Sequence, residues 1–356
     1  MRVGTLIGRF QFMHNGHKNL IQQALDQVDH LVICLGGMAI APTSRNPFSF
    51  VERVEHIKTC FPAAKISYVG IHDHPESNQD WVDEVVNKVN QQSLETKEIT
   101  LFGHKKDDTG WYMDLFSAKG WKINNFDTDD SISGTKVRHE AYCGNDAAET
   151  KGWKEYVPTE LFNHFELWLE TPAGQARSAE YVKEKQYQAD YADLPYPPIF
   201  PAVDAFVTCQ GHVLLVKRGG LRGRGLYAMP GGHLDSRERM IDGSIRELIE
   251  ETCINLDPKV IKSYWTGDTL TLDNPNRSLL GRVTSEVFYF ALPHDICGGS
   301  LPDVKGADDA AEALWMPIEK LRGDYFSTMD AVRIQFFEDH LWAIKELLPD
   351  CMALRA

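Results

Sequence analysis

Several features that mark common protein classes are missing from this 356-residue chain. No segment approaches the roughly 20 apolar residues that a membrane-spanning helix requires, and the N-terminus carries no apolar core followed by a cleavage site. None of the seven cysteines forms a CxxC pair, so we expect buried free thiols in a reducing compartment. The sequence therefore predicts a cytoplasmic protein that neither spans nor crosses a membrane.

Basic tracts are also missing. The formal net charge is −14, from 37 Lys and Arg against 51 Asp and Glu. A net acidic protein without a basic tract does not attract polyanions, so we expect no binding to nucleic acid or to an anionic membrane. Hydrophobic residues make up 43% of the chain, which is enough to build cores, and the length exceeds that of one typical domain. We therefore expect two domains.

The segment Gly231–Ile254 carries the clearest chemical pattern. Glu247, Glu250 and Glu251 fall on one side of an α-helix, because residues three or four apart are neighbours on its surface. Such crowding is unfavourable unless a hard cation neutralises the carboxylates, and Mg²⁺ or Mn²⁺ prefers oxygen ligands. A solvated acidic helix face is the alternative interpretation.

A turn and an arginine accompany these carboxylates. Gly231 and Gly232 precede the helix, where a tight turn can direct a backbone carbonyl at the same cation. Arg246 can pair with Glu238 across the intervening loop. The whole pattern resembles the signature of the Nudix hydrolases, which use water and a divalent metal to cleave nucleoside diphosphates linked to another moiety.

The Nudix resemblance implies a role for each residue of the pattern. It assigns metal binding to Gly231, Glu247, Glu250 and Glu251, with Glu250 and Glu251 also assigned to catalysis. It assigns the positioning of loop and helix to Gly232, Glu238 and Arg246. One position departs from the family, because Cys253 stands where glycine is usual. A non-glycine residue at a left-handed helix cap costs on the order of 1 kcal/mol, so we expect a small stability penalty and no lost ligand.

The chain begins with a short apolar run, Val3–Ile7, followed by a turn with two histidines and a helical pattern. His14 and His17 lie at the expected helix N-terminus, with Gly16 between them. A helix N-terminus and imidazole N–H donors suit the phosphates of a nucleotide, and glycine lets the main chain approach them. Two ordinary surface histidines are the alternative.

The HNGH segment resembles the HxGH motif of the nucleotidyltransferases, which join a nucleotide to a phosphorylated acceptor with loss of pyrophosphate. Ile132–Arg138 resembles the ISxTxxR motif of the same superfamily. A Ser or Thr can cap a helix there, and Arg138 can meet the β- and γ-phosphates of ATP. The resemblance implies phosphate handling by His14, His17, Arg9 and Arg138, with Ser133 and Thr135 as supporting donors and Mg²⁺ on the triphosphate.

Within this superfamily, the chain is similar to the archaeal-type nicotinamide mononucleotide adenylyltransferases. The similarity rests on the segment SRNPF at 44–48, on Glu52-Arg53 after it, and on Asn78 with Trp81. In that subgroup the tryptophan stacks on the nicotinamide ring, and an indole face suits a flat cationic pyridinium. A plain core aromatic is the alternative for Trp81. The resemblance implies substrate binding by Arg9, Gly16, Arg45, Asn78, Trp81, Ser133 and Thr135.

Two further polar segments are weaker candidates. His72 and His74 have no further ligand spacing, so we interpret them as part of a polar loop rather than a metal site. The segment Gly103–Phe116, GHKKDDTGWYMDLF, is similar to what bifunctional members of this subgroup carry, and a solvated loop is the alternative for its lysines.

The apolar pattern predicts an α/β fold in both halves. Expected strands alternate with expected helices in the N-terminal part, which indicates a doubly wound parallel sheet with its site at the carboxyl ends of the strands. The strands are expected at 3–7, 31–35, 66–69 and 99–103, and the helices at 18–28, 50–60 and 81–91. In the C-terminal part we expect a hairpin around Gln210-Gly211, then the helix that carries the three glutamates, and then a strand at 283–292. The apolar residues 313–316 precede a further helix, which is expected to begin near Pro317. The Nudix resemblance implies an α/β/α sandwich there.

Tyrosines and prolines gather between these parts, from 171 to 201, so we expect a stiff extended connection. The predicted organisation is a nucleotidyltransferase domain at 1–175, a linker at 176–200 and a Nudix domain at 201–350.

An acidic segment, Ala307–Pro317, resembles the acidic loop that follows the signature in several Nudix enzymes. Glu312 is its candidate for an extra metal ligand or for the base that activates water. A solvated loop explains the same residues equally well.

Both halves together resemble the bifunctional adenylyltransferase–Nudix proteins of NAD metabolism. The resemblance implies in-line adenylyl transfer from ATP to nicotinamide mononucleotide, giving NAD and pyrophosphate with no side-chain nucleophile. It also implies Mg²⁺-dependent hydrolysis of ADP-ribose to AMP and ribose 5-phosphate. Another nucleoside diphosphate substrate, or a non-catalytic metabolite sensor, is the alternative for the Nudix half, and the complete set of carboxylates favours catalysis. The sequence leaves homo-oligomer formation, the preferred metal and the deamidated mononucleotide open.

Overall fold

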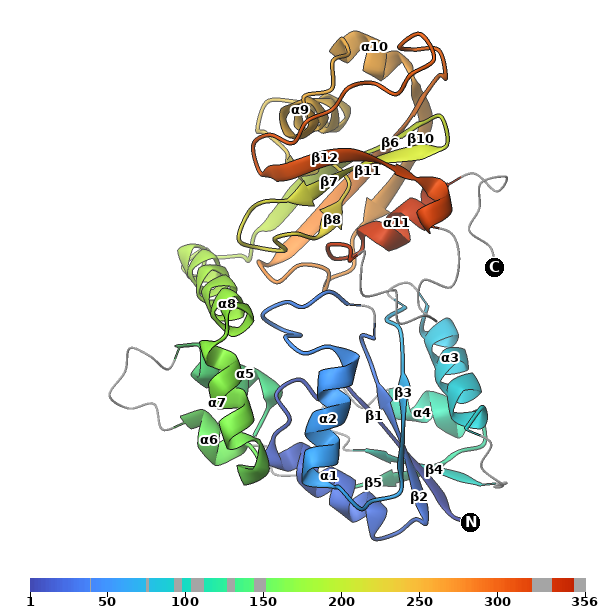
Figure 1. The fold of residues 1–356 in the computed structure, drawn as a ribbon, viewed down its shortest axis with the longest axis vertical. Coiled ribbons are helices and arrows are strands. Elements are labelled where there is room, and N and C mark those ends of the chain that lie inside the picture. The colour runs from blue at the N-terminus through green and yellow to red at the C-terminus, as the bar shows by residue number, and fades with distance from the viewer. Residues whose placement is uncertain are drawn as a thin grey trace. The chain divides into compact units, whose positions relative to one another are not determined.

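The computed structural model divides the chain into two compact units (Figure 1). The first consists of Met1–Met38 and Pro42–Val182, and the second of Ala39–Ala41 and Lys183–Ala356. The structure describes residues 1–38, 40–74, 77–92, 98–103, 112–126, 132–143, 152–321 and 335–348. The lysines of the segment at 103–116 lie outside them. Across the described residues, none of the helices combines the length and the apolar character that a membrane span requires.

The first unit is built on a five-stranded sheet in the order β3-β2-β1-β4-β5. Every neighbouring pair in it is parallel, so the predicted parallel sheet is confirmed. Its strands are β1 (Val3–Gly8), β2 (His30–Leu35), β3 (Ile66–Gly70), β4 (Ile99–Gly103) and β5 (Lys122–Asn125). The edge strand β5 was not predicted, because its sequence KINN has no apolar run. The order reverses beside β1, so the crevice at the carboxyl end of β1 is where a ligand of this fold binds.

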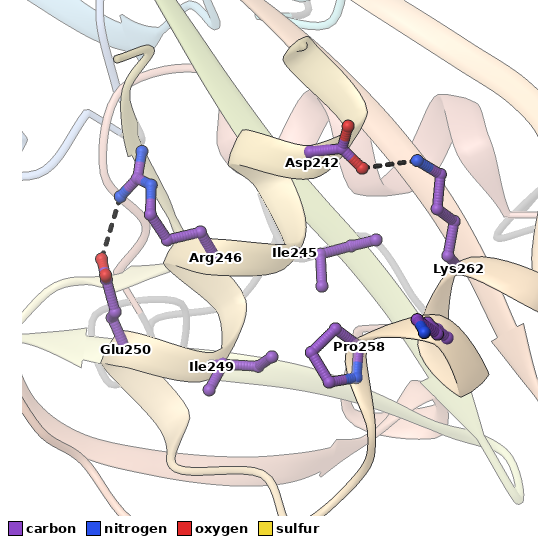
Figure 2. A pocket seen from close by; sticks show the side chains of 8 residues that line it. Asp242, Ile245, Arg246, Ile249, Glu250, Pro258 and Lys262 are labelled. Atoms are coloured by element: carbon purple, nitrogen blue, oxygen red, sulfur yellow. Dashed lines mark hydrogen bonds and ion pairs between the residues drawn. The ribbon is translucent and has the colours of Figure 1, made fainter. Parts of the chain in front are cut away.

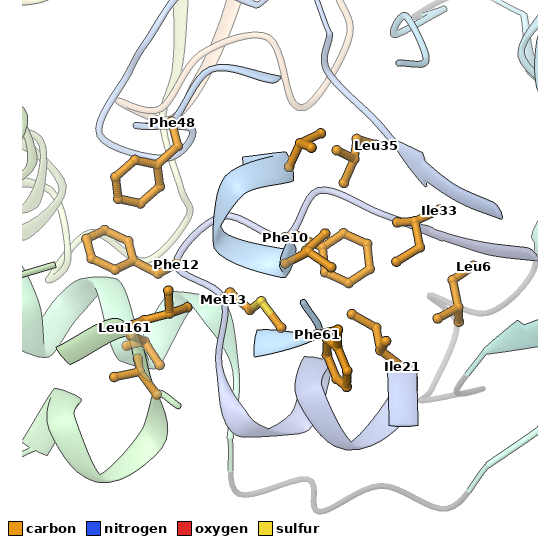
Figure 3. Close-up of a cluster of buried hydrophobic side chains, with 14 of the residues drawn as sticks. Leu6, Phe10, Phe12, Met13, Ile21, Ile33, Leu35, Phe48, Phe61 and Leu161 are labelled. Atoms are coloured by element: carbon orange, nitrogen blue, oxygen red, sulfur yellow. The ribbon is translucent and has the colours of Figure 1, made fainter. Parts of the chain in front are cut away.

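Helices cover both faces of this sheet (Figure 1). Side chains of β1 and β2 alternate between two buried clusters, one with Leu6 and Ile33 and the other with Val3 and Val32. The first cluster, shown in Figure 3, also takes residues from α1 (Asn15–Leu25), α2 (Phe50–Cys60), α5 (Gly134–Cys143) and α7 (Phe162–Glu170). The second takes residues from α3 (Asn78–Asn90) and α4 (Tyr112–Ser117). The short α6 (Gly152–Tyr156) and a 3₁₀ turn, Thr159–Leu161, precede α7.

The segment expected to be an extended connection is mostly helical. Helix α8 runs from Pro172 to Asp190, so the prediction was wrong for these 19 residues. Pro172 stands at the first helical position, where its missing N–H costs nothing, and the other prolines of the segment follow the helix end. The segment is rich in Ala, Gln, Glu and Lys, whose helix propensity was the overlooked signal. The boundary between the two units falls after Val182, inside α8.

The second unit is built on a mixed sheet with the central order β10-β11-β6-β7-β12. The short strand β8 pairs with β7, and β9 pairs with β6. Its strands are β6 (Ile199–Cys209), β7 (His212–Arg218), β8 (Tyr227–Ala228), β9 (Gly231–His233), β10 (Trp265–Leu272), β11 (Arg282–Leu292) and β12 (Ala310–Pro317). The predicted β6–β7 hairpin is confirmed. Gln210 and Gly211 both have positive φ, at 49° and 74°, as a tight two-residue turn requires.

Helices also cover both faces of the second sheet (Figure 1). One buried cluster joins the sheet to α9 (Met240–Thr252) and α10 (Pro258–Ser263). Another joins it to α11 (His340–Leu347) and to the 3₁₀ turn Ile318–Leu321, which forms where a helix was expected after Pro317. The predicted α/β/α sandwich is therefore confirmed. The six cysteines in the described part of the chain are free thiols, as expected. The expected burial holds only for Cys34 and Cys209, because Cys253 is exposed and the other three, Cys60, Cys143 and Cys297, are partly buried.

Candidate active sites

In the first unit, His14 and His17 stack against each other at the start of α1, with ring centroids 3.6 Å apart. Nδ1 of each ring accepts a hydrogen bond from the backbone N–H of the other residue, at 3.4 Å in both cases. Because both Nδ1 atoms accept, the neutral rings carry their protons on Nε2. Each ring therefore keeps one N–H donor for a ligand.

The surroundings hold both imidazoles in the neutral form. Burial lowers the pKa of His14 to about 4, and the charge of Arg138 acts in the same direction. Burial, His14 and Arg138 together lower the pKa of His17 well below its ordinary value. A Cβ atom at Gly16 would lie 3.1 Å from the His14 ring, so glycine leaves the rings room. At neutral pH the pair donates N–H groups while Arg138 supplies the positive charge.

Arg138 lies in the second turn of α5, where two hydroxyl side chains act on the helix start. Oγ of Ser133 accepts the backbone N–H of Lys136 at 3.2 Å, and Nη2 of Arg138 donates to Oγ1 of Thr135 at 3.1 Å. Gly134 lies close beneath the guanidinium, because a Cβ atom there would lie 3.2 Å from Nη1 of Arg138. The helix start and the arginine are thus fixed together beside the histidine pair.

Arg9, Arg45 and Arg138 gather positive charge at this edge of the sheet. Burial lowers the pKa of Arg45, and the charge of Arg9 lowers it further. Burial also lowers the pKa of Arg138, and the charges of Arg45 and Arg9 lower it further. Arg9 is restrained by Asp73, whose Oδ2 accepts from Nη2 at 2.8 Å. Neighbouring guanidiniums that depress one another's pKa favour the binding of a polyanion such as a triphosphate.

Arg53 is a positioning residue to which the sequence analysis gave no role. It is 1% exposed, and its Nη1 donates to the carbonyls of Arg9 at 2.8 Å and Gly36 at 2.7 Å. Arg53 therefore ties the loops after β1 and β2 to helix α2. A charged residue on the apolar face of that helix was the signal available in the sequence.

Asn78 and Trp81 lie in the first turns of α3. Trp81 packs edge-on against Tyr112 and Phe116, with ring centroids 5.7 Å and 5.6 Å away, and lies partly buried against the core on that face. These contacts support the core-aromatic alternative, and stacking on a nicotinamide ring stays a prediction.

His72 and His74 converge on one carboxylate. Nδ1 of His72 and Nε2 of His74 lie 2.6 Å and 2.7 Å from the oxygens of Glu84, and Nζ of Lys88 lies 2.6 Å from the same group. The two histidines thus form a polar loop anchored to α3, as the sequence indicated.

In the second unit, Arg246 is the centre of the acidic segment. Its Nη1 donates to Glu247 at 2.8 Å and to Glu250 at 2.9 Å, and its Nη2 donates to Glu238 at 2.7 Å. The Arg246–Glu238 pair expected across the loop is therefore present. Because Nη1 is shared, Glu247 and Glu250 lie on the same side of α9.

Gly231 and Gly232 bring strand β9 against both the sheet and helix α9. The N–H of Gly231 donates to Oε2 of Glu251 at 3.0 Å. A Cβ atom at Gly231 would lie 2.2 Å from Oδ1 of Asp204, and one at Gly232 would lie 2.6 Å from Oε1 of Glu247. Neither position has room for a side chain, so the pair of glycines is required for this approach.

For two of the carboxylates, burial outweighs the positive charge nearby. Burial raises the pKa of Glu251 to about 8; the Gly231 N–H and Arg218 oppose the rise, and Glu247 and Asp204 add to it. Burial also raises the pKa of Glu247. A divalent cation reverses both effects, since it stabilises the ionised form.

No three His, Cys, Asp or Glu side chains in the described residues are already gathered as a metal cage. Arg246 accounts for this, because it holds Glu247 and Glu250 while Gly231 holds Glu251. The residues nevertheless fit a hard divalent cation, which takes several oxygen ligands and favours crowded carboxylates with raised pKa values. The cation would share Glu247 and Glu250 with Arg246.

Glu312 lies on strand β12 rather than in a loop, opposite Lys217 of β7, so the loop prediction was wrong from Ala310 onward. Its role as a ligand or base stays a prediction. The acidic side chains that raise the pKa values of Glu247 and Glu251 include Asp308 and Asp204, which the sequence analysis did not single out.

An apolar hollow lies between α9 and α10 (Figure 2). Ile245, Ile249 and Pro258 line it, and the pairs Asp242–Lys262 and Arg246–Glu250 stand at its edges. Glu250 is therefore on the open side of α9, whereas Glu251 is 4% exposed.

Cys253 caps α9 with φ 46° and ψ 30°, which is the left-handed conformation expected from the sequence. We expect the Cys253→Gly variant to raise the free energy of unfolding by about 1 kcal/mol, because glycine removes the Cβ strain at this position. Urea denaturation followed by circular dichroism measures it. The control is Cys253→Ala, which also removes the thiol but keeps the strain; equal stability of the two variants contradicts the prediction.

Two family models match the chain, the cytidylyltransferase-like model over residues 5–140 and the NUDIX domain model over residues 198–338. The nicotinamide/nicotinic acid mononucleotide adenylyltransferase of Acinetobacter baylyi is 33% identical over 44% of this chain and 84% of its own length. The ADP-ribose pyrophosphatase of Methanocaldococcus jannaschii is 32% identical over 42% of this chain and 78% of its own length. A bifunctional NMN adenylyltransferase/ADP ribose pyrophosphatase from Francisella tularensis, complexed with AMP and a Mn ion, is similar over 98% of this chain and 99% of its own, with TM-score 0.83 and 28% identity.

Proposed function

Because the chain belongs to the nicotinamide mononucleotide adenylyltransferases in its first part and to the Nudix hydrolases in its second, we propose that it is a bifunctional enzyme of NAD metabolism. The likeness to the bifunctional Francisella protein over nearly the full length of both chains carries this proposal. The motifs with His14, His17 and Arg138 lie in the first unit, which the cytidylyltransferase-like model matches. The segment Gly231–Ile254 lies in the second unit, which the NUDIX model matches.

The first unit transfers an adenylyl group from ATP to nicotinamide mononucleotide, giving NAD and pyrophosphate. The 5′-phosphate of the mononucleotide attacks the α-phosphorus in line, so the protein needs no nucleophile of its own. The Nε2–H groups of His14 and His17 and the guanidinium of Arg138 hold the phosphates, and Ser133 and Thr135 fix the helix start beneath them. Arg9, Gly16, Arg45, Asn78 and Trp81 complete the substrate site. Charge neutralisation by Arg9, Arg45 and Arg138 favours departure of pyrophosphate.

The second unit hydrolyses ADP-ribose to AMP and ribose 5-phosphate. Glu247, Glu250, Glu251 and the Gly231 carbonyl would hold Mg²⁺ or Mn²⁺, which supplies Lewis acidity and an activated water when bound. Glu238 and Arg246 hold the helix against the loop, and Gly232 lets β9 approach it. Glu312 is the candidate base. The carboxylates of Glu247 and Glu251, with their raised pKa values, support a cation site.

Product analysis of the purified chain tests both activities. We expect NAD and pyrophosphate from ATP with nicotinamide mononucleotide, and AMP with ribose 5-phosphate from ADP-ribose and Mg²⁺, each resolved by chromatography. Chelation of the divalent cation with EDTA should stop hydrolysis of ADP-ribose, because the carboxylates of Glu247, Glu250 and Glu251 act through the metal. Absence of NAD overturns the first assignment. Binding of ADP-ribose without release of AMP overturns the second and favours a metabolite sensor.

A further inference from the structure

Glu84, in the second turn of α3, is a partly buried carboxylate that holds the loop between β3 and α3. Its Oε1 accepts from Nδ1 of His72 at 2.6 Å, and its Oε2 accepts from Nε2 of His74 at 2.7 Å, because an ionised carboxylate only accepts. The backbone N–H of His72 also donates to both oxygens, at 3.3 Å and 3.2 Å. One carboxylate therefore fastens the loop on either side of Asp73.

Lys88, one turn further along α3, keeps this carboxylate charged. Its Nζ lies 2.6 Å from Oε1 of Glu84 and donates to the carbonyl of Gly70 at 2.6 Å. Burial raises the pKa of Glu84, but the hydrogen bonds from both histidines and from Lys88 outweigh it, so the pKa lies below its ordinary value. Because an ammonium already neutralises the carboxylate, the cluster is an anchor for the loop rather than a metal site.

Asp73, which the anchored loop presents between the two histidines, is the counter-ion of Arg9. Its Oδ2 accepts from Nη2 of Arg9 at 2.8 Å. The side chains of Arg9 and Asp73 are 41% and 37% exposed. An ion pair as exposed as this contributes little by itself, since the cost of ordering two mobile side chains offsets most of the attraction. The contact is therefore well ordered only if the loop holds Asp73 in place.

The position of Arg9 matters because it belongs to the cationic group with Arg45 and Arg138. Burial and the charge of Arg9 lower the pKa of Arg45, and the charge of Asp73 opposes them. Asp73 is therefore within electrostatic reach of two of these arginines. On its other side, Nη1 of Arg9 donates to Oδ1 of Asn46 at 3.1 Å. Asp73 and Asn46 together hold Arg9 against the repulsion of its cationic neighbours.

We propose that Glu84 is a positioning residue for the triphosphate of ATP, because it fixes the loop from which Asp73 directs Arg9. This inference rests on the proposed adenylyl transfer and adds to it a residue that does not touch the substrate. Arg9 then meets the phosphates in an orientation that is set before ATP binds, which lowers the cost of ordering it in the complex.

The anchor is separate from the contacts that hold α3 itself. Val82, Val85 and Val89 are buried on the face of α3 that packs on the sheet. Loss of the anchor therefore loosens the loop but leaves α3, with Asn78 and Trp81, in place. Since these two residues belong to the proposed mononucleotide side of the site, we expect the defect to be confined to ATP.

The test compares Glu84→Gln with the matched control Asp83→Asn. Glutamine fills the same space, but its amide nitrogen cannot accept, so at least one histidine loses its acceptor. Asp83 precedes Glu84 on α3 and pairs instead with Lys119, at 2.8 Å. Binding of α,β-methylene-ATP, which cannot transfer its adenylyl group, is measured by calorimetry at saturating Mg²⁺. We expect Glu84→Gln to weaken binding about 10-fold through lost orientation, and Asp83→Asn to bind within about twofold of the wild type. Equal losses in the two variants would overturn the proposal.

A double variant tests whether Glu84 acts through Asp73. We expect Asp73→Asn alone to weaken analogue binding by a similar factor of about 10. If both residues act on Arg9 by the same route, Glu84→Gln combined with Asp73→Asn binds no more weakly than Asp73→Asn does, because the effects of coupled residues do not add. Losses that multiply to about 100-fold would mean independent actions and would overturn the proposal.

Steady-state kinetics and thermal denaturation separate positioning from damage to the fold. We expect Glu84→Gln to raise KM for ATP about 10-fold and to leave KM for nicotinamide mononucleotide unchanged. Equal rises in both KM values, with a lower unfolding temperature, would indicate general loosening of the first unit and would overturn the proposal.

His74→Ala is the milder variant if Glu84→Gln does not fold, because it removes one of the two imidazole contacts. We expect it to weaken analogue binding about threefold, as the loss of one hydrogen bond does, and wild-type affinity would overturn the proposal. If the wild type forms no NAD although Glu84→Gln weakens analogue binding as expected, the adenylyl transfer is refuted and the role of Glu84 in holding the triphosphate stands.

Discussion

The Glu250→Gln variant is expected to lose release of AMP from ADP-ribose while it keeps forming NAD from ATP and nicotinamide mononucleotide. Glutamine keeps the size of the side chain but removes the charge that a divalent cation requires. Because the metal supplies several kcal/mol of transition-state stabilisation, we expect kcat/KM for ADP-ribose to fall by about 10²- to 10³-fold. Chromatographic assay of both reactions on the same preparation measures it.

Asp242→Asn is the matched control for Glu250→Gln. Asp242 lies on the same helix, and its carboxylate accepts from Lys262 at 2.5 Å rather than from Arg246. We expect this control to hydrolyse ADP-ribose within about twofold of the wild type, because surface ion pairs contribute little. Equal losses in the two variants would indicate damage to α9 rather than a metal ligand, and loss of NAD formation in either would contradict two independent sites.

The His17→Ala variant is expected to show the converse pattern, with NAD formation reduced by about 10²- to 10³-fold in kcat and ADP-ribose hydrolysis unchanged. Removal of one preorganised donor from developing negative charge has an effect of this size. Alanine also leaves the backbone N–H of His14 without its acceptor, which weakens the start of α1. Initial rates with varied ATP and varied mononucleotide measure the effect on kcat and KM.

His30→Ala controls for the loss of an imidazole from the same unit. His30 opens β2 and bonds to Ser67 at 2.9 Å, at the end of the sheet opposite the site. Thermal denaturation of both variants tests whether the first unit remains folded. A folded His17→Ala protein with wild-type NAD formation would refute the assignment of the histidine pair to the phosphates.

Residues close together in the sequence were predicted well. The histidine pair, the Arg246–Glu238 contact and the left-handed Cys253 all depend on spacings within a turn or a loop. Helix pitch and turn geometry fix such relations almost without regard to the rest of the chain.

The sequence analysis missed the roles of residues that act across the fold. Arg53 bonds to a carbonyl 44 positions away, and Asp204 reaches Gly231 only because β6 pairs with β9. The guanidinium of Arg218 lies 4.1 Å from the ring centroid of Phe337, and a backbone bridge between Tyr227 and Phe336 holds the two segments together. These contacts depend on strand order, which short-range patterns do not encode. Helix α8 was missed for another reason, since it is rich in good helix formers but weak in apolar period.

The order of strands in the first unit has a consequence for synthesis on the ribosome. The histidine pair follows β1, yet its partner Arg138 lies on α5, after both β4 and β5 have been added to the sheet. A nascent chain that ends before Arg138 holds the imidazoles but not the guanidinium that lies beside them. The proposed phosphate site is therefore completed only after all five strands of the sheet have been made, whereas Gly231 to Glu251 of the second unit leave the ribosome almost together.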